Sequence, residues 1–180
     1  MFSIARAALA CTALAALPHL ALAQPLSAEE ILKRLEAQSQ AIESGPGQPR
    51  TIRPKTLAPI QPQDVPVQPP DDTVDLAVYF EFDSAILRPD AREQLEAACI
   101  AMKKLPRSYL IIGHTDAAGP DEYNRRLSTA RAAEVVRYLV TDCGIEEARL
   151  QPIGLGETRL KDSADPLGAV NRRVEVQVGG

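Results

Sequence analysis

Two oppositely charged residues in one segment have the types and the spacing that a doubly charged ligand would need. Residues 113–132 read GHTDAAGPDEYNRRLSTARA, with Asp116 in a glycine-containing turn and Arg131 fifteen positions later. A guanidinium can bind a carboxylate through two parallel hydrogen bonds, and a carboxylate can accept hydrogen bonds from an ammonium group. The alternative is that Asp116 and Arg131 form a surface salt bridge with each other. The positions of the strand and the helix that carry them distinguish the two possibilities.

The two charged residues lie where a predicted strand meets a predicted helix. The segment SYLIIGHTD reads as a strand, and the helix within 119–144 has Pro120 in its first turn and Gly144 at its end. One stripe of this helix, at spacings i, i+3, i+4 and i+7, holds Asn124, Leu127, Ser128 and Arg131. We therefore expect Asp116 across a crevice from that stripe, outside the strand ends where ligands of α/β sheets commonly bind.

The last 108 residues, 73–180, alternate strands and helices. VDLAVYFEFD alternates apolar and polar side chains, which is typical of a strand, and its apolar face includes Phe82. Helically spaced apolar residues follow within 88–106, and short strands are predicted in LQPIGLGE and NRRVEVQVGG. The order β-α-β-α-β-β predicts a fold of the α+β or α/β sandwich class, in which a mixed sheet carries its helices on one face.

An export signal is predicted over residues 1–23. Arg6 precedes an apolar run that ends Ala-Leu-Ala, the small-x-small pattern before signal-peptidase cleavage, so the mature chain is expected to begin at Gln24. A membrane anchor is a weaker alternative, because the run is shorter than the ~20 apolar residues of a spanning helix and contains Pro18. Lipid modification of Cys11 is a third reading, although only four residues separate this cysteine from Arg6.

Two segments precede the domain. Residues 24–45 predict a short amphipathic helix with a capping box of Ser27 and Glu30, which is read either as a frayed spacer or as a surface that docks on a partner. Residues 46–72 are rich in proline and cannot bury enough apolar surface to offset their ordering entropy. They are expected to form an extended tether. A tether implies that the parts of the protein or its partners at its two ends are held apart.

Composition excludes several classes of function. The formal net charge of −4 gives no electrostatic footprint for nucleic acid. His114 is the sole histidine after the signal segment, so zinc sites of the His/Cys type and a Ser-His-Asp triad are nearly excluded, and no catalytic residue, metal or cofactor is expected. Cys99 and Cys143 could pair in an oxidising compartment, and two buried free thiols are the alternative.

Four motifs resemble a known family. GHTDAAG, YNRRLSTARA, GLGE and NRRVEV are similar to the motifs of OmpA-like domains, also described as the OmpA/MotB C-terminal domain family, and the resemblance covers residues 73–178. It implies non-covalent binding of peptidoglycan through the diaminopimelate residue of its stem peptide. That residue carries an ammonium and a carboxylate at its free end, which Asp116 and Arg131 complement.

The resemblance also implies which residues contact peptidoglycan. Asn124 falls on the asparagine of the Y-N step, and Phe82 and Asp83 fall at the end of the first strand, where family members offer backbone amides to the ligand. The Phe82 side chain itself is expected in the core. The full set of expected contacts is Phe82, Asp83, Thr115, Asp116, Asn124, Leu127, Ser128 and Arg131.

Other polar residues near these motifs are given structural roles. His114 is read as a packed residue at a strand end, and Arg172 and Arg173 as structural residues or as electrostatic support. The chain departs from the usual family pattern at Arg159, where a proline is common nearby, and after Gly168, where an arginine is common. Neither departure affects the expected charged pair.

The expected function is to tether the outer membrane or an envelope complex to the cell wall, from the periplasm. A few charge-assisted hydrogen bonds must overcome the cost of association, so one stem peptide should bind weakly and many copies would retain the protein by avidity. The alternative is an adaptor whose helix within 24–45 recruits an outer-membrane or envelope protein. A wall hydrolase would need a metal cluster or a nucleophile–base pair, which the motifs do not supply.

Overall fold

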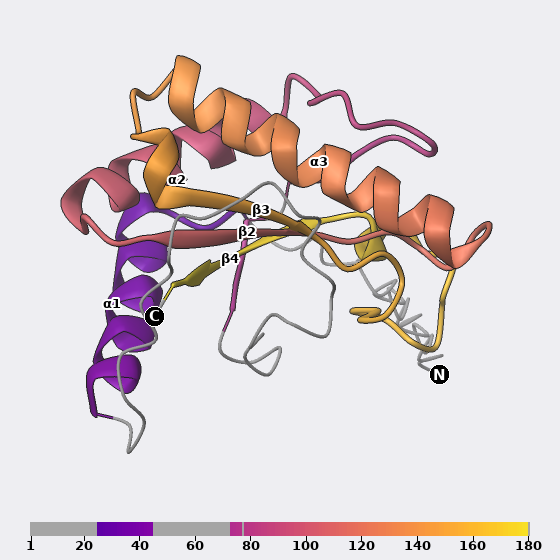
Figure 1. Cartoon of the computed structure of the whole chain (residues 1–180), viewed down its shortest axis with the longest axis horizontal. Coiled ribbons are helices and arrows are strands. Elements are labelled where there is room, and N and C mark those ends of the chain that lie inside the picture. The colour runs from indigo at the N-terminus through magenta and orange to yellow at the C-terminus, as the bar shows by residue number, and fades with distance from the viewer. Residues whose placement is uncertain (1–24, 45–72, 77, 180) are drawn as a thin grey trace, which may run out of the picture.

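The computed structural model describes residues 25–44, 73–76 and 78–179, so the predicted signal segment and the proline-rich segment lie outside the described residues. The elements in chain order are α1 (Ala28–Ser44), β1 (Val74–Asp75), α2 (Ala91–Lys104), β2 (Tyr109–Gly113), α3 (Asp121–Thr141), η3 (Glu147–Arg149), β3 (Leu150–Gly154), η4 (Ala169–Asn171) and β4 (Val174–Val178). From β1 onward the order of strands and helices is the predicted β-α-β-α-β-β, which is confirmed (Figure 1).

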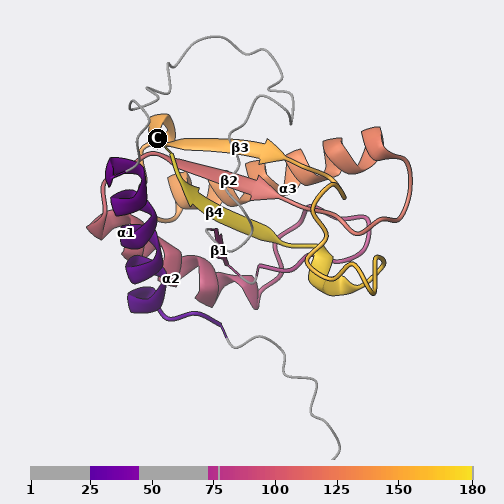
Figure 2. The ribbon, with the colours of Figure 1, turned by 90° about the horizontal axis from the view of Figure 1, so that it is seen from below.

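The strands form one mixed sheet in the order β1-β4-β2-β3. β2 and β3 are parallel, as their connection through α3 requires, whereas β4 is antiparallel to both of its neighbours. Figure 2 shows the four strands side by side with α2 and α3 behind them. The predicted mixed sheet with helices on one face is therefore confirmed for these two helices.

The first strand is shorter than its apolar alternation suggested. Only Val74 and Asp75 pair with β4, and one further bond joins the Leu76 amide to the Val174 carbonyl. Val78 and Phe80 are still buried, so the alternation correctly identified the inward side chains of this stretch. The pattern fails at its end, because the chain turns at Phe82 and Asp83.

Two glycines let α3 lie unusually close to the sheet. A Cβ atom on Gly113 would stand 2.0 Å from the backbone oxygen of Ser128, and a Cβ on Gly154 would stand 2.4 Å from the backbone nitrogen of Thr129. Neither position accepts a larger residue without moving the helix. This close approach brings the side chains of α3 to the carboxyl end of β2.

The helix predicted within 24–45 is confirmed, but it is not a spacer. α1 packs on the domain of its own chain, where Ile31 and Leu35 are fully buried and Ser39 nearly so. The backbone of Leu26 exchanges hydrogen bonds of 2.8 and 3.1 Å with the side chain of Gln94 in the first turn of α2. The spacer reading is wrong, because the apolar stripe of this helix is buried within the same molecule.

The docking of α1 also protects the edge of β4. β1 pairs no further along β4 than Val176, and the amide of Val178 donates instead to the side-chain oxygen of Gln38, at 2.8 Å. The elements on both sides of residues 45–72 thus belong to one folded body. The predicted proline-rich tether lies outside the described residues, and the two elements that flank it are in contact.

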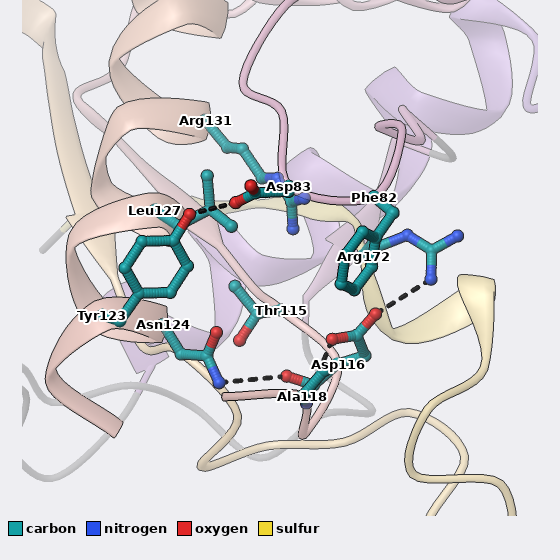
Figure 3. Close-up of a pocket in the computed structure, with 10 residues that line it drawn as sticks. All are labelled: Phe82, Asp83, Thr115, Asp116, Ala118, Tyr123, Asn124, Leu127, Arg131 and Arg172. Carbon is teal, nitrogen blue, oxygen red and sulfur yellow. Dashed lines mark hydrogen bonds and ion pairs between the residues drawn. The ribbon is translucent and has the colours of Figure 1, made fainter. Parts of the chain in front are cut away.

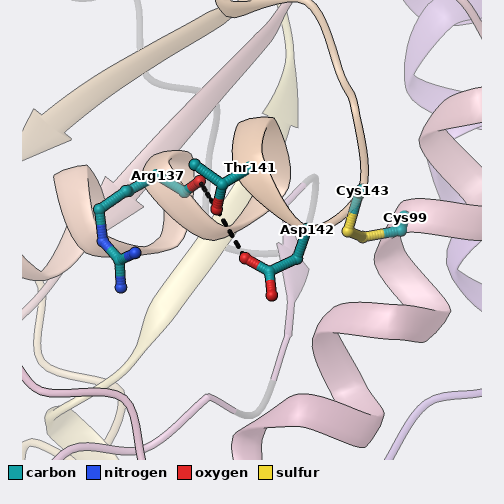
Figure 4. The surroundings of a disulfide bond; sticks show 5 residues. All are labelled: Cys99, Arg137, Thr141, Asp142 and Cys143. Carbon is teal, nitrogen blue, oxygen red and sulfur yellow. Dashed lines mark hydrogen bonds between the residues drawn. A yellow bond between two sulfur atoms is a disulfide. The ribbon is translucent and has the colours of Figure 1, made fainter.

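A disulfide joins the two helices behind the sheet. Cys99 of α2 and Cys143, just after α3, are bonded with their Cα atoms 5.9 Å apart, within the usual range for a disulfide (Figure 4). Both side chains are buried. Of the two readings left open by the sequence, the structure supports the disulfide.

No helix among the described residues is long and apolar enough to cross a membrane.

We predict that Leu35→Ala lowers the free energy of unfolding by about 2–5 kcal/mol, because it leaves a cavity between α1 and the domain. Urea denaturation followed by circular dichroism measures the change. Glu36→Ala, exposed on the outer side of the same helix, is the matched control and should change stability by less than ~0.5 kcal/mol. Equal stability of the two variants would contradict the docking of α1.

We predict that the double variant Cys99→Ser/Cys143→Ser loses up to about 4 kcal/mol, the amount expected for a disulfide that closes a loop of 44 residues. The same denaturation experiment is run with and without a reductant. Reductant should destabilise the wild-type protein and leave the double variant unchanged. If the stability of the wild-type protein is the same with and without reductant, even after incubation with reductant in the unfolded state, the two thiols are free.

Candidate functional site

A solvent-open crevice lies at the carboxyl end of β2, against the first half of α3 (Figure 3). Its walls come from the segment after β2, from α3, from the loop after residue 80 and from the segment before β4. The lining residues are Phe82, Asp83, Thr115, Asp116, Ala118, Tyr123, Asn124, Leu127, Arg131 and Arg172. The structure thus brings together all the expected contact residues except Ser128.

Arg131 is fully buried and its guanidinium is held by backbone carbonyls. Nε donates to the Ser84 oxygen at 2.9 Å, Nη1 to the His114 oxygen at 3.1 Å and Nη2 to the Glu81 oxygen at 3.2 Å. The group also lies 5.2 Å from the centre of the Phe80 ring. Three of its five N–H groups are used, and two have no partner among the described residues.

Burial lowers the pKa of Arg131 to about 10, a shift that the nearby Asp116 carboxylate opposes. The side chain therefore keeps its positive charge at neutral pH. A buried cation whose described partners are neutral carbonyls can bind an anion through its remaining N–H groups.

Asp116 forms its ion pair with a different arginine. Its Oδ2 accepts a hydrogen bond from Nη1 of Arg172 at 2.9 Å, and its Oδ1 accepts one from the amide of Ala118 at 3.2 Å. The expected alternative, a surface salt bridge between Asp116 and Arg131, is not formed. The two charges instead face the same crevice, each with hydrogen-bonding capacity to spare.

Arg172 is a site residue that sequence reasoning did not select. It was expected as structural or electrostatic support, and its bond to Asp116 is consistent with support, but its side chain also lines the crevice. Its position in the NRRVEV motif was the available signal. Nothing in the sequence indicated which of its neighbours it would meet, because its partner lies 56 residues away in the chain.

Asn124 and Thr115 stand at the floor of the crevice. The Asn124 amide nitrogen donates to the Asp116 carbonyl at 3.4 Å and to the carboxylate of Glu157, so it fixes the turn that carries the aspartate. The hydroxyl of Thr115 is buried, lines the crevice and has no hydrogen-bond partner among the described residues. An unpaired buried hydroxyl at a crevice wall is available to a ligand.

Ser128 is buried behind the crevice. Its hydroxyl donates to the Arg125 carbonyl at 2.9 Å and accepts from the Gly156 amide at 2.9 Å. These two bonds tie α3 to the segment after β3. The position of Ser128 therefore supports a structural contribution, whereas Leu127 on the same stripe does line the crevice.

Phe82 corrects the expectation of a core side chain. Its ring is 66% exposed and lines the crevice. The neighbouring Asp83 has a positive φ of 56°, which turns the chain out of the strand direction. The hydroxyl of Tyr123, a lining residue that the sequence did not single out although it precedes Asn124, donates to the Asp83 carboxylate.

The His114 side chain lies on the face of the sheet that is turned away from α3, as the alternation of side chains along β2 requires. It is fully buried, and its Nε2 lies 3.5 Å from the Glu175 carboxylate. Burial lowers the pKa of His114, which keeps the ring neutral at pH 7. This placement agrees with the packed role expected for it.

The described residues contain no cluster of three or more His, Cys, Asp or Glu side chains that could hold a metal ion. The lining of the crevice offers two guanidinium groups, carboxylates, a hydroxyl and two aromatic rings, and these groups suit the binding of a charged organic ligand.

The mixed sheet with helices on one face is the fold of OmpA-like domains, and a charged crevice lies at its strand ends. The sequence profile of the OmpA family matches residues 79–173, and the chain belongs to that family.

Relatives include outer membrane porin F of Pseudomonas fluorescens, 40% identical over 108 residues, which cover 58% of this chain and 33% of the porin. The peptidoglycan-associated lipoprotein of Pseudomonas aeruginosa is 37% identical over 101 residues, covering 55% of this chain and 60% of the lipoprotein. The chain thus matches between a third and three fifths of the length of these relatives.

Solved structures share the fold. The peptidoglycan-associated lipoprotein from Burkholderia pseudomallei superposes with a TM-score of 0.50 at 33% identity, over 56% of this chain and 87% of that one. The OmpA-like domain of FopA1 from Francisella tularensis has a TM-score of 0.52 at 22% identity, over 55% of this chain and 67% of that one. α1, at residues 28–44, lies outside the segment matched by the family profile.

We predict that Arg131→Lys lowers the free energy of unfolding by about 2–4 kcal/mol, because an ammonium cannot reproduce the fork that joins three carbonyls. Arg126→Lys, exposed on the same helix, is the control and should stay within ~0.5 kcal/mol of the wild type. Chemical denaturation of both variants tests the prediction, and a fully stable Arg131→Lys protein would show that charge alone suffices.

Proposed function

We propose that the crevice binds peptidoglycan non-covalently through the free end of a diaminopimelate residue in the stem peptide. The observation that carries the proposal is that Asp116 and Arg131 face one crevice without pairing to each other. The free end of diaminopimelate carries one ammonium and one carboxylate, so it complements this pair. The names of the peptidoglycan-associated lipoproteins among the relatives point to the same polymer.

The two charged groups of the ligand have distinct partners. Its carboxylate lies against the two remaining N–H groups of Arg131, and its ammonium donates to the Asp116 carboxylate. Asp116 can accept from the ammonium and from Arg172 together, because an ionised carboxylate offers about four lone-pair positions. The hydroxyl of Thr115 and the backbone beside Asp83 complete the polar surface around the ligand.

Weak binding of each stem peptide suits an anchor. A few charge-assisted hydrogen bonds, each contributing ~1.5–3 kcal/mol, exceed an association cost of at least ~4 kcal/mol by a small margin. The wall presents many copies of the stem peptide, so rebinding retains the protein. The role we infer is non-catalytic attachment of the cell envelope to the wall.

The inferred location is the periplasm, beside the outer membrane. The predicted signal segment supports export, and the disulfide between Cys99 and Cys143 suits an oxidising compartment. The relatives named as outer membrane porins fit the same part of the cell. The adaptor alternative loses support, because the apolar stripe of α1 that would recruit a partner is already buried.

We predict that Asp116→Asn lowers retention on purified diaminopimelate-containing sacculi by at least tenfold, since the amide keeps the shape but loses the charge that holds the ammonium. Sedimentation of the protein with sacculi measures retention, and free diaminopimelate should release the wild-type protein. Asp121→Asn, exposed in the first turn of α3, is the matched control and should bind normally. Equal retention of both variants would refute the proposed site.

A further inference from the structure

An aromatic side chain is exposed to solvent at the mouth of the crevice. Phe82 is 66% exposed, whereas the charged residues deeper in the crevice, Asp116 and Arg131, are 5% and 0% exposed. The crevice is therefore graded, with charge at its inner end and apolar surface at its opening. Contiguous exposed apolar surface, unlike a single scattered side chain, marks a site of interaction.

The outward position of Phe82 is imposed by the surrounding structure. Arg131 donates to the carbonyls of Glu81 and Ser84, which bracket Phe82 and Asp83 in the chain. Between these two fixed points, Asp83 takes a left-handed backbone conformation that non-glycine residues seldom adopt. The same arginine that faces the crevice thus holds the loop that presents the ring, and the sparsely populated backbone state at Asp83 is maintained by these bonds.

A second aromatic ring stands on the other side of the opening. Tyr123, in the first turn of α3, lines the crevice and is 39% exposed, and its hydroxyl is directed to the Asp83 carboxylate. Figure 3 shows Phe82 and Tyr123 on opposite sides of the crevice with Thr115 between them. Two aromatic rings, one from the loop after residue 80 and one from α3, therefore line the same crevice as Asp116.

We propose that Phe82 and Tyr123 form an apolar mouth that covers the aliphatic stem of the ligand, and that this mouth selects a zwitterionic head carried on an unbranched methylene chain. The proposal rests on the function proposed above, in which that chain is the side chain of diaminopimelate. The rings add no hydrogen bond to the ligand. They contribute by removing its methylenes, and their own exposed surface, from water.

This assignment gives the Phe82 side chain a role that differs from that of its backbone. A short amino acid such as alanine offers the charged head without the stem, so it would engage Asp116 and Arg131 and leave the mouth in water. Diaminopimelate fills both regions. The charges then fix which end of the ligand enters, and the apolar mouth discriminates by the length of the stem.

Calorimetric titration of the full-length mature protein with the tripeptide L-Ala–γ-D-Glu–meso-diaminopimelate tests the proposal. Phe82→Ala should bind about five- to tenfold more weakly, from the loss of roughly half of the apolar area of one ring. Its heat-capacity change on binding should also be less negative than that of the wild type. Phe82→Leu, which keeps apolar surface at the mouth, should restore most of the affinity and of the heat-capacity change.

Ile86→Ala is the matched control. Ile86 is in the same loop and is 77% exposed, but it does not line the crevice, so its removal should leave the affinity unchanged. Wild-type protein that fails to bind the tripeptide would refute the proposed function itself. Wild-type binding that Phe82→Ala matches in affinity and heat capacity would refute the apolar mouth alone.

Discussion

The structure depends on one buried guanidinium. Arg131 reaches from α3 across the end of β2 and joins the His114 carbonyl to the carbonyls of Glu81 and Ser84. These three hydrogen bonds compensate part of the cost of burying the charge, and they fix the strand end and the loop relative to the helix. Arg131 also lines the crevice. The residue that closes the fold at this end is therefore also the residue that leaves a positive charge for a ligand.

The opposite end of the sheet is closed by α1. Gln38 reaches the amide of Val178, which pairs in register with Tyr109 at the start of β2, whereas the crevice lies beyond Gly113 at the end of the same strand. The two ends of the sheet differ. At the end near Val178, α1 covers the edge of β4, whereas the crevice at the other end is open to solvent. The crevice and α1 therefore lie at opposite ends of β2.

Local sequence patterns correctly predicted the helices and strands of this domain. The alternation in β1 and the helical spacing in α2 and α3 gave the order of elements, since each pattern depends only on neighbours in the chain. The stripe that holds Asn124, Leu127 and Arg131 was also readable, and these three side chains do line one crevice. Phe82 was misplaced, because its outward turn is imposed by an arginine 49 positions later in the sequence, which no alternation pattern records.

The sequence by itself determined which elements form, in what order, and which charged residues stand at the end of β2 and on α3, because periodicity and residue type are local properties. The tertiary structure decided which groups meet: Asp116 pairs with Arg172, Cys99 bonds to Cys143, and α1 docks on α2. Each of these contacts joins residues at least 44 positions apart. These contacts arise from the packing of distant elements, such as the close approach of α3 to Gly113 and Gly154, which exists only once the chain has folded.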